Sequence, residues 1–99
     1  MINMASSHDY LIYILDLLRD IRGLTYKKMM GEYLLYKDNI LFGGIYDNRF
    51  LVKKTKSLES LGLKEAIPYP SAKPMLIVDI EDFEEIERIV NLAISDIHK

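Results

Sequence analysis

The 99-residue sequence predicts an α+β domain, in which a mostly antiparallel sheet packs with an N-terminal and a C-terminal helix. Apolar residues recur with helical spacing near both ends of the chain. Between these segments, two Asp-Asn pairs separate short apolar and aromatic runs, as hairpin turns do. The expected sheet is a central three- to four-stranded meander plus one later strand. The length is that of one domain, so residues 1–99 are expected to share one core.

Residues 7–22 are predicted to form the first helix. Its apolar face follows the helical spacing of three, four and seven residues: Leu11, Ile14, Leu15, Leu18 and Ile21. Ser6, with Asp9 three residues later, resembles a capping box at the helix start. Gly23 lies where a left-handed residue would end the helix.

The Asp38-Asn39 and Asp47-Asn48 pairs predict a meander of strands at 32–37, 40–46 and 49–54. Asn and Asp tolerate positive φ better than most residues, so each pair suits a two-residue turn. Tyr26–Met30 adds a fourth strand if this segment is extended. Two-residue turns without a bulge would place these residues opposite one another: Tyr36 and Leu41, Leu34 and Gly43, Leu35 and Phe42, Tyr33 and Gly44.

With this register both faces of the meander are apolar over much of their area. We therefore expect helices of the same chain on one face, and a helix or a second subunit on the other. The Gly43-Gly44 pair is either a bulge, which would shift this register, or a place where a neighbouring segment approaches closely.

The second half of the chain predicts a short helix, a connection, a strand and a long helix. Residues 55–62 form the short helix, with Thr55 or Ser57 as N-cap and Gly62 as its stop. Residues 64–74 hold three prolines and are expected to be irregular. Residues 75–79, MLIVD, form a buried strand. Residues 81–98 form the last helix, whose apolar face is Phe83, Ile86, Ile89, Val90, Ala93 and Ile97.

Composition excludes several classes of site. The chain has no cysteine, so it forms no disulfide and has no thiolate nucleophile. No apolar run approaches the ~18 residues of a membrane span. The start, MINMASSHDY, lacks the features of a signal peptide, so we expect a cytoplasmic protein with no membrane partner. Residues 1–64 carry ten Lys/Arg against seven Asp/Glu, and residues 65–99 carry three against eight. This asymmetry is weaker than a duplex-binding domain usually shows.

No constellation of residues indicates catalysis, a metal or a cofactor. The two histidines, His8 and His98, lie at the ends of the predicted helices, where a solvated histidine is common. Five acids around the start of the last helix could imitate a cation site: Asp79, Glu81, Asp82, Glu84 and Glu85. Acids at a helix N-terminus are better explained by the helix dipole. The sequence therefore predicts no catalytic, cofactor-binding or metal-binding residue and no enzyme.

Four lysines are the candidate binding residues: Lys27, Lys28, Lys53 and Lys54. They could contact nucleic acid, and the seven tyrosines could stack on bases. The competing interpretation is that lysines at the ends of strands prevent aggregation at a sheet edge, and that the tyrosines pack within the sheet. A third possibility is a small-molecule pocket near Tyr69 and the prolines.

The run YKKMMGEYLLYKDNILFGGIYDNRFLVK at 26–53, followed by PYPSAKPMLIVD at 68–79, resembles the TfoX N-terminal-domain family of competence regulators related to Sxy. The start, SSHDYLIYILDLL, also looks like single-domain members of that family. Departures from the pattern are Met30, where an aromatic is common, and Glu32 and Leu34, where glycines often occur.

This resemblance implies an α+β domain like those of secretion-chaperone-like folds, and a regulatory role without catalysis. It implies a protein partner, such as a transcription regulator, and a homodimer is one form such contacts could take. Two-domain members carry a helical C-terminal domain, which we expect to be missing from this chain. The family supplies no catalytic or ligand residues to carry over.

Overall fold

The computed structural model describes residues 6–98 and shows an α+β fold, as the sequence predicts. The five N-terminal residues, on which the signal-peptide expectation partly rests, lie outside the described residues. The elements along the chain are α1 (His8–Leu17), β1 (Leu24–Met29), β2 (Glu32–Lys37), β3 (Ile40–Ile45), β4 (Phe50–Lys53), the 3₁₀ helix η1 (Lys56–Leu61), β5 (Glu65–Ala66), β6 (Met75–Ile77) and α2 (Phe83–Ile97).

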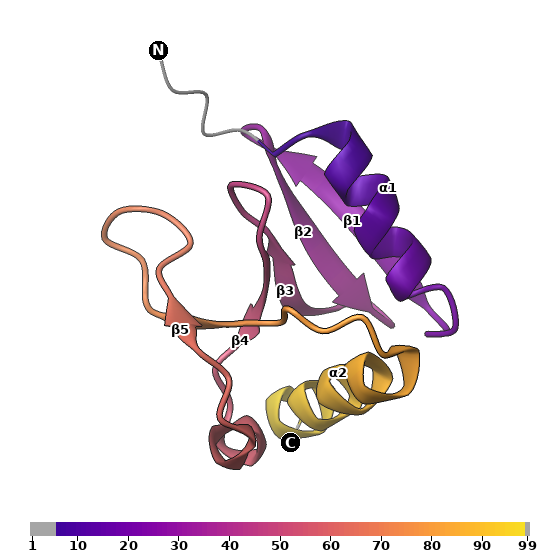
Figure 1. The fold of residues 1–99 in the computed structure, drawn as a ribbon, viewed down its shortest axis with the longest axis vertical. Coiled ribbons are helices and arrows are strands. Elements are labelled where there is room, and N and C mark those ends of the chain that lie inside the picture. The colour runs from indigo at the N-terminus through magenta and orange to yellow at the C-terminus, as the bar shows by residue number, and fades with distance from the viewer. Residues whose placement is uncertain (1–5, 99) are drawn as a thin grey trace.

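The strands form one six-stranded sheet in the order β1-β2-β3-β4-β6-β5, and every neighbouring pair is antiparallel. In Figure 1, α1 runs beside β1 and β2, while α2 lies near the other end of the molecule. Side chains from both helices join one core cluster with Tyr33, Leu35 and Ile45 of the sheet. Both helices therefore pack on the same face of the sheet, which we call the helix face.

Three two-residue turns connect the first four strands. Asp38-Asn39 and Asp47-Asn48 both have positive φ, between 49° and 67°, which confirms the turns predicted there. Met30 and Gly31 form the third turn, with φ of 52° and 85°. The extended segment before Met30 is thus the fourth strand of the meander, the alternative that the sequence left open.

Of the β2–β3 residue pairs that the sequence predicts, only one is correct. Tyr36 lies opposite Leu41 as expected, but Leu35 then pairs with Gly43, so that Phe42 is the extra residue of a β-bulge. The β3–β4 register is the one that a two-residue turn at Asp47-Asn48 gives, with Gly43 opposite Val52, Gly44 opposite Leu51 and Ile45 opposite Phe50. The bulge lies one residue before the Gly43-Gly44 pair, and the glycines themselves are places of close approach: a Cβ atom would clash with the Leu51 carbonyl at Gly43 and with the Tyr33 carbonyl at Gly44.

The bulge sorts side chains between the two faces. Because of the extra residue, Phe42 and the inward residues of β4 join Tyr33 and Leu35 on the helix face. The opposite face, which we call the second face, receives Leu34, Tyr36, Leu41, Tyr46 and Leu51 together with polar residues. Both faces are therefore apolar over much of their area, as the sequence predicts, but only the helix face forms the continuous core, and the second face also carries polar residues.

Helix α1 is shorter than predicted, ending at Leu17 rather than at 22. Its N-cap is Ser7, whose Oγ accepts a hydrogen bond from the Tyr10 amide at 3.1 Å, and not Ser6. The chain beyond Leu17 tightens into turns, in which the Ile21 amide donates to the carbonyl of Leu18 at 2.9 Å. Hydrogen bonds of this kind join residues three apart, as in a 3₁₀ turn, and Leu18 and Ile21 remain buried although the α-helix has ended. Gly23 has positive φ but precedes β1 instead of capping α1.

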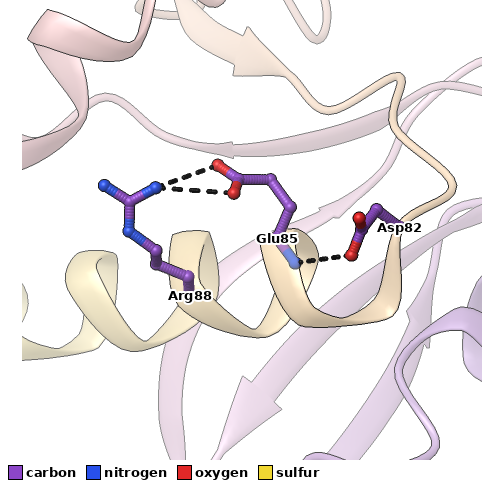
Figure 2. Close-up of polar contacts among 3 residues, drawn as sticks. All are labelled: Asp82, Glu85 and Arg88. Atoms are coloured by element: carbon purple, nitrogen blue, oxygen red, sulfur yellow. Dashed lines mark hydrogen bonds and ion pairs between the residues drawn. The ribbon is translucent and has the colours of Figure 1, made fainter.

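Helix α2 begins after Asp82, whose carboxylate accepts a hydrogen bond from the Glu85 amide at 3.1 Å (Figure 2). Glu85 in turn pairs with Arg88 one turn later, at 3.3 Å. The buried face of α2 contains Ile86, Ile89, Val90 and Ala93, as the spacing predicts.

The connection before β6 is more ordered than predicted. Residues 65–66 form the short edge strand β5, paired with β6, where an irregular segment was expected. Thr55 is the N-cap of η1, although its hydroxyl makes no capping bond, and Gly62 ends this helix with φ of 72°. The backbone and hydroxyl of Ser57 both donate to the Asp96 carboxylate at 2.7 Å, which ties η1 to α2.

A polar network that the sequence did not reveal joins the start of the chain to the β3–β4 turn. One carboxylate oxygen of Glu32 accepts from the Ser6 amide and the other from the Asp47 amide, both at 2.9 Å. Ser6 Oγ accepts from the Asn48 amide at 3.0 Å, and the Asn48 side chain accepts from the Ser7 amide at 2.9 Å. Glu32 therefore holds two segments that are distant in sequence, before α1 and after β3.

Replacing Glu32 should lower stability because two backbone amides lose a charged acceptor. For Glu32→Ala we expect a loss of about 1–3 kcal/mol in the free energy of unfolding, measured by urea denaturation. Glu32→Gln, which keeps one carbonyl acceptor, should fall between this variant and the wild type. Glu84→Ala removes an exposed carboxylate whose only described role is to favour the helix dipole of α2, and it should cost no more than about 0.5–1 kcal/mol. Equal effects of Glu32→Ala and Glu84→Ala would contradict this role.

Candidate functional site

The structure separates the lysines that the sequence singled out. Lys27 and Lys28 are consecutive residues of the edge strand β1, so their side chains lie on opposite faces, Lys27 on the second face and Lys28 on the helix face. Lys53, at the end of β4, also belongs to the second face. Three strand spacings lie between β1 and β4, or about 14 Å. Lys27 and Lys53 therefore share a face but form no compact patch.

Strand β1 is the most exposed strand of the meander. Only Leu24 is partly buried, and the other five residues are exposed. Tyr26 packs edge-on against Tyr33 at 6.0 Å between ring centroids yet remains half exposed. Met30, in the turn that follows, is 97% exposed. Within the described residues, the lysines of β1 lie on an edge strand of the sheet, where lysines can protect against aggregation.

The second face has two parts. The first, which we call the open face, consists of Thr25, Lys27, Leu34, Tyr36 and Leu41 of β1–β3. Its three apolar side chains are only partly buried, and within residues 6–98 both α-helices pack on the helix face. Glu32 lies on the same face of the sheet, and its carboxylate is bound to backbone amides. The open face is therefore an apolar surface with one exposed cation.

The second part is a groove of about 410 Å³ beside β3 and β4, which we call the tyrosine groove. The residues that line it come from β3, β4, β6, the positions just after β3 and β4, and the loop at 67–74: Leu41, Gly43, Tyr46, Lys53, Lys54, Pro68, Tyr69, Ala72, Lys73, Pro74 and Met75. This cavity lies near Tyr69 and the prolines, where the sequence suggested a small-molecule pocket. It also unites one of the two predicted lysine pairs, Lys53 and Lys54, with the unpredicted Lys73.

Tyr46 and Tyr69 form the aromatic part of the groove, with ring centroids 6.2 Å apart. Tyr46 is 8% exposed and lies over Gly44, since a Cβ atom at Gly44 would come within 2.8 Å of the Tyr46 ring and 2.6 Å of the Tyr33 carbonyl oxygen. Gly44 therefore provides the space that seats the Tyr46 ring. Tyr69 is 59% exposed and supplies an accessible aromatic surface.

The two histidines and the acids at the start of α2, which the sequence also offered as candidates, do not line this groove. His8 is in the first turn of α1 and His98 caps the end of α2, and both are exposed. Among residues 6–98, no three His, Asp or Glu side chains lie close enough to hold a metal ion. At the start of α2, the Asp82 carboxylate accepts a hydrogen bond from the Glu85 amide, and the Glu85 carboxylate pairs with Arg88 (Figure 2). Within the same span of the chain, no helix is both long and apolar enough to cross a membrane.

Comparison with known proteins places the chain in a family. The sequence is 30% identical, over 98 residues, to an uncharacterized 12.7 kDa protein in the trpE 5′ region of Spirochaeta aurantia. The alignment covers 92% of this chain and 85% of that protein. The chain belongs to the family of this spirochaete protein. No family model matches the sequence. The similarity spans nearly all the described elements, so it concerns the whole fold rather than one segment.

Burial raises the pKa of Tyr46 above its ordinary value of 10.0, and the neighbouring Tyr69, Glu32 and Tyr36 add to this. The folded-state pKa therefore exceeds the unfolded-state pKa. The resulting stabilisation is fully present below about pH 10 and is lost as the pH rises through the raised value. Tyr10, whose pKa is raised by burial and by Asp79, contributes in the same direction.

We expect Tyr46→Phe to lose stability less steeply than the wild type as the pH rises above about 10, because the variant has no hydroxyl to ionise there. Urea denaturation midpoints between pH 8 and pH 11 measure this dependence for both proteins. Parallel curves for the two proteins would contradict the assignment of this alkaline loss to Tyr46.

Proposed function

We propose that this protein is a small regulatory module, without catalytic chemistry of its own, that acts by binding a partner protein through the open face of its sheet. This proposal is based on the observation that the two α-helices cover only one face of the sheet. Both helices pack on the helix face, while Leu34, Tyr36 and Leu41 on the opposite side remain partly accessible.

The chemistry of the open face supports a protein partner. A surface that combines aliphatic and tyrosine side chains with a cation at its rim has the composition of protein interfaces. Lys27 is its exposed charge, and Glu32, on the same face of the sheet, is engaged by backbone amides. An acidic group on the partner would therefore complement Lys27. Exposed Met29, on the same face of β1, extends the apolar area.

The resemblance to the TfoX N-terminal domain supports the regulatory part of the proposal. The segments that carry this resemblance, residues 26–53 and 68–79, include all of the open face except Thr25, together with the loop of the tyrosine groove. The proposal includes a cytoplasmic location and a partner that regulates transcription. Since the open face lies within this one domain, binding would need no second domain.

A pair of adjacent lysines provides the test of the open face. Lys27→Glu reverses the charge on the open face, and Lys28→Glu makes the same change on the opposite side of β1. We expect partner capture from the native cell to fall about tenfold or more with Lys27→Glu, because like charges then face each other. Lys28→Glu should capture as much partner as the wild type.

Two results would contradict the proposal. If both variants bind the partner like the wild type, the open face is not the binding surface. If both lose binding equally, the edge of β1 and not its face is responsible. Both lysines are exposed, so neither change should prevent folding.

A second copy of the chain is another occupant that the open face could accept. An isologous dimer would bring the two Lys27 side chains onto one interface, which disfavours it electrostatically. Sedimentation equilibrium at high micromolar concentration tests this alternative. A dimer that Lys27→Glu alters and Lys28→Glu leaves unchanged would assign the open face to self-association, whereas a monomer leaves it to a different protein.

A further inference from the structure

We infer that the tyrosine groove is a binding site for a small organic anion that carries a flat ring. The groove lies at the opposite side of the second face from β1, beside β4 and the loop at 67–74, and it shares only Leu41 with the open face. Its volume of about 410 Å³ is within the range of small-molecule sites, roughly 300–1,000 Å³.

The charge of the groove is one-sided. Its lining holds three lysines and, within the described residues, no carboxylate. Lys54 is neutralised by Glu65, at 2.8 Å from Nζ to Oε2, and this hydrogen bond raises the pKa of Lys54. Among residues 6–98, neither Lys53 nor Lys73 has an ion-pair partner. Two ammonium groups, one on β4 and one on the loop, therefore remain available for an anion.

The remaining lining is aromatic and aliphatic. Tyr46 and Tyr69 lie at 50° to each other, so their rings offer two differently inclined surfaces. Met75, a flexible thioether side chain, adds an adaptable apolar wall. A flat ring can pack against Tyr69, which is otherwise an exposed aromatic in a water-facing loop. Cations on one side and rings on the other match a ligand with an acidic group attached to a planar body.

The loop that closes the groove is held in place before any ligand arrives. The Arg49 guanidinium donates to the Tyr46 carbonyl at 3.1 Å and to the Ile67 carbonyl at 3.2 Å, which links the end of β3 to the start of the loop. Within the loop, the Ala72 amide donates to the Tyr69 carbonyl at 3.1 Å. Pro68 is buried, and Pro74 precedes β6. A preformed site loses less entropy on binding.

Either a phosphate or a carboxylate would satisfy the two lysines, so both are tested. Adenosine 5′-monophosphate and 4-hydroxybenzoate are the ring-bearing anions, with adenosine and 4-hydroxybenzamide as neutral counterparts. Inorganic phosphate and acetate carry the charge without a ring. Binding is followed by titration of backbone amide resonances by NMR. We expect at least one ring-bearing anion to bind with a Kd below about 1 mM and to shift the amides of Gly43, Tyr69 and Ala72.

The neutral counterpart and the ring-free anion should each bind at least about tenfold more weakly. Lys53→Gln and Lys73→Gln should each weaken binding of the ring-bearing anion by about tenfold. Lys73 is exposed, so Lys73→Gln remains informative even if Lys53→Gln folds poorly. Lys27→Gln is the matched control on the same face of the sheet and should leave the Kd unchanged.

Three results would overturn the inference. One is the absence of binding by both ring-bearing anions at 10 mM. Another is equal affinity for a ring-bearing anion and its neutral or ring-free counterpart. The third is equal weakening by Lys27→Gln and Lys73→Gln. None of these results bears on partner capture through the open face, which is tested at Lys27 and Lys28.

Discussion

Two-residue turns constrain the first four strands, and the rest of the structure depends on them. All six residues of the three turns have positive φ, and four of these residues are Asp or Asn. Turns of this kind match the right-handed twist of the strands and fix which residues lie opposite one another. With the meander fixed, the side chains of β2, β3 and β4 have only one set of neighbours, and the helices must cover whichever face is more apolar.

The bulge at Phe42 decides which face that is. The extra residue aligns the apolar residues of β3 and β4 with Tyr33 and Leu35, and the helices pack over them. The second face keeps Leu34, Tyr36 and Leu41 together with Lys27 and Lys53. Its two parts, the open face and the tyrosine groove, follow from this one displacement. The proposed binding of a partner and the inferred binding of an anion both depend on a face that the helices leave uncovered.

The sequence was informative about many of the features that local chemistry decides, although it placed the N-cap and the end of α1 wrongly. The Asp38-Asn39 and Asp47-Asn48 turns, the end of the short helix at Gly62 and the spacing of α2 were predicted because turn propensity and helical periodicity are local properties. The position of the bulge, at Phe42 and not at the adjacent glycines, could not be predicted, because it depends on how Phe42 packs against helices elsewhere in the chain. The β5 strand was missed because its two residues are ordered by pairing with β6.

For the candidate site, the sequence identified the lysines but not their arrangement. Lys27 and Lys28 were treated as a pair, yet strand geometry sends them to opposite faces. Lys73 and Lys53 line the same groove because the loop at 67–74 lies beside β4, a long-range arrangement that no short motif reveals. Glu32 was noted only as a departure from a family pattern, although it joins two distant segments.

The central claim is that the helices cover one face of this sheet and leave the other accessible. The most direct measurement is solvent paramagnetic relaxation of methyl protons by NMR, with a soluble gadolinium chelate and dilute protein. The account predicts strong relaxation of the Leu34 and Leu41 methyl groups, and protection of Leu35 and Ile45 on the helix face. Equal protection of all four residues would show that the second face is covered and would contradict the account.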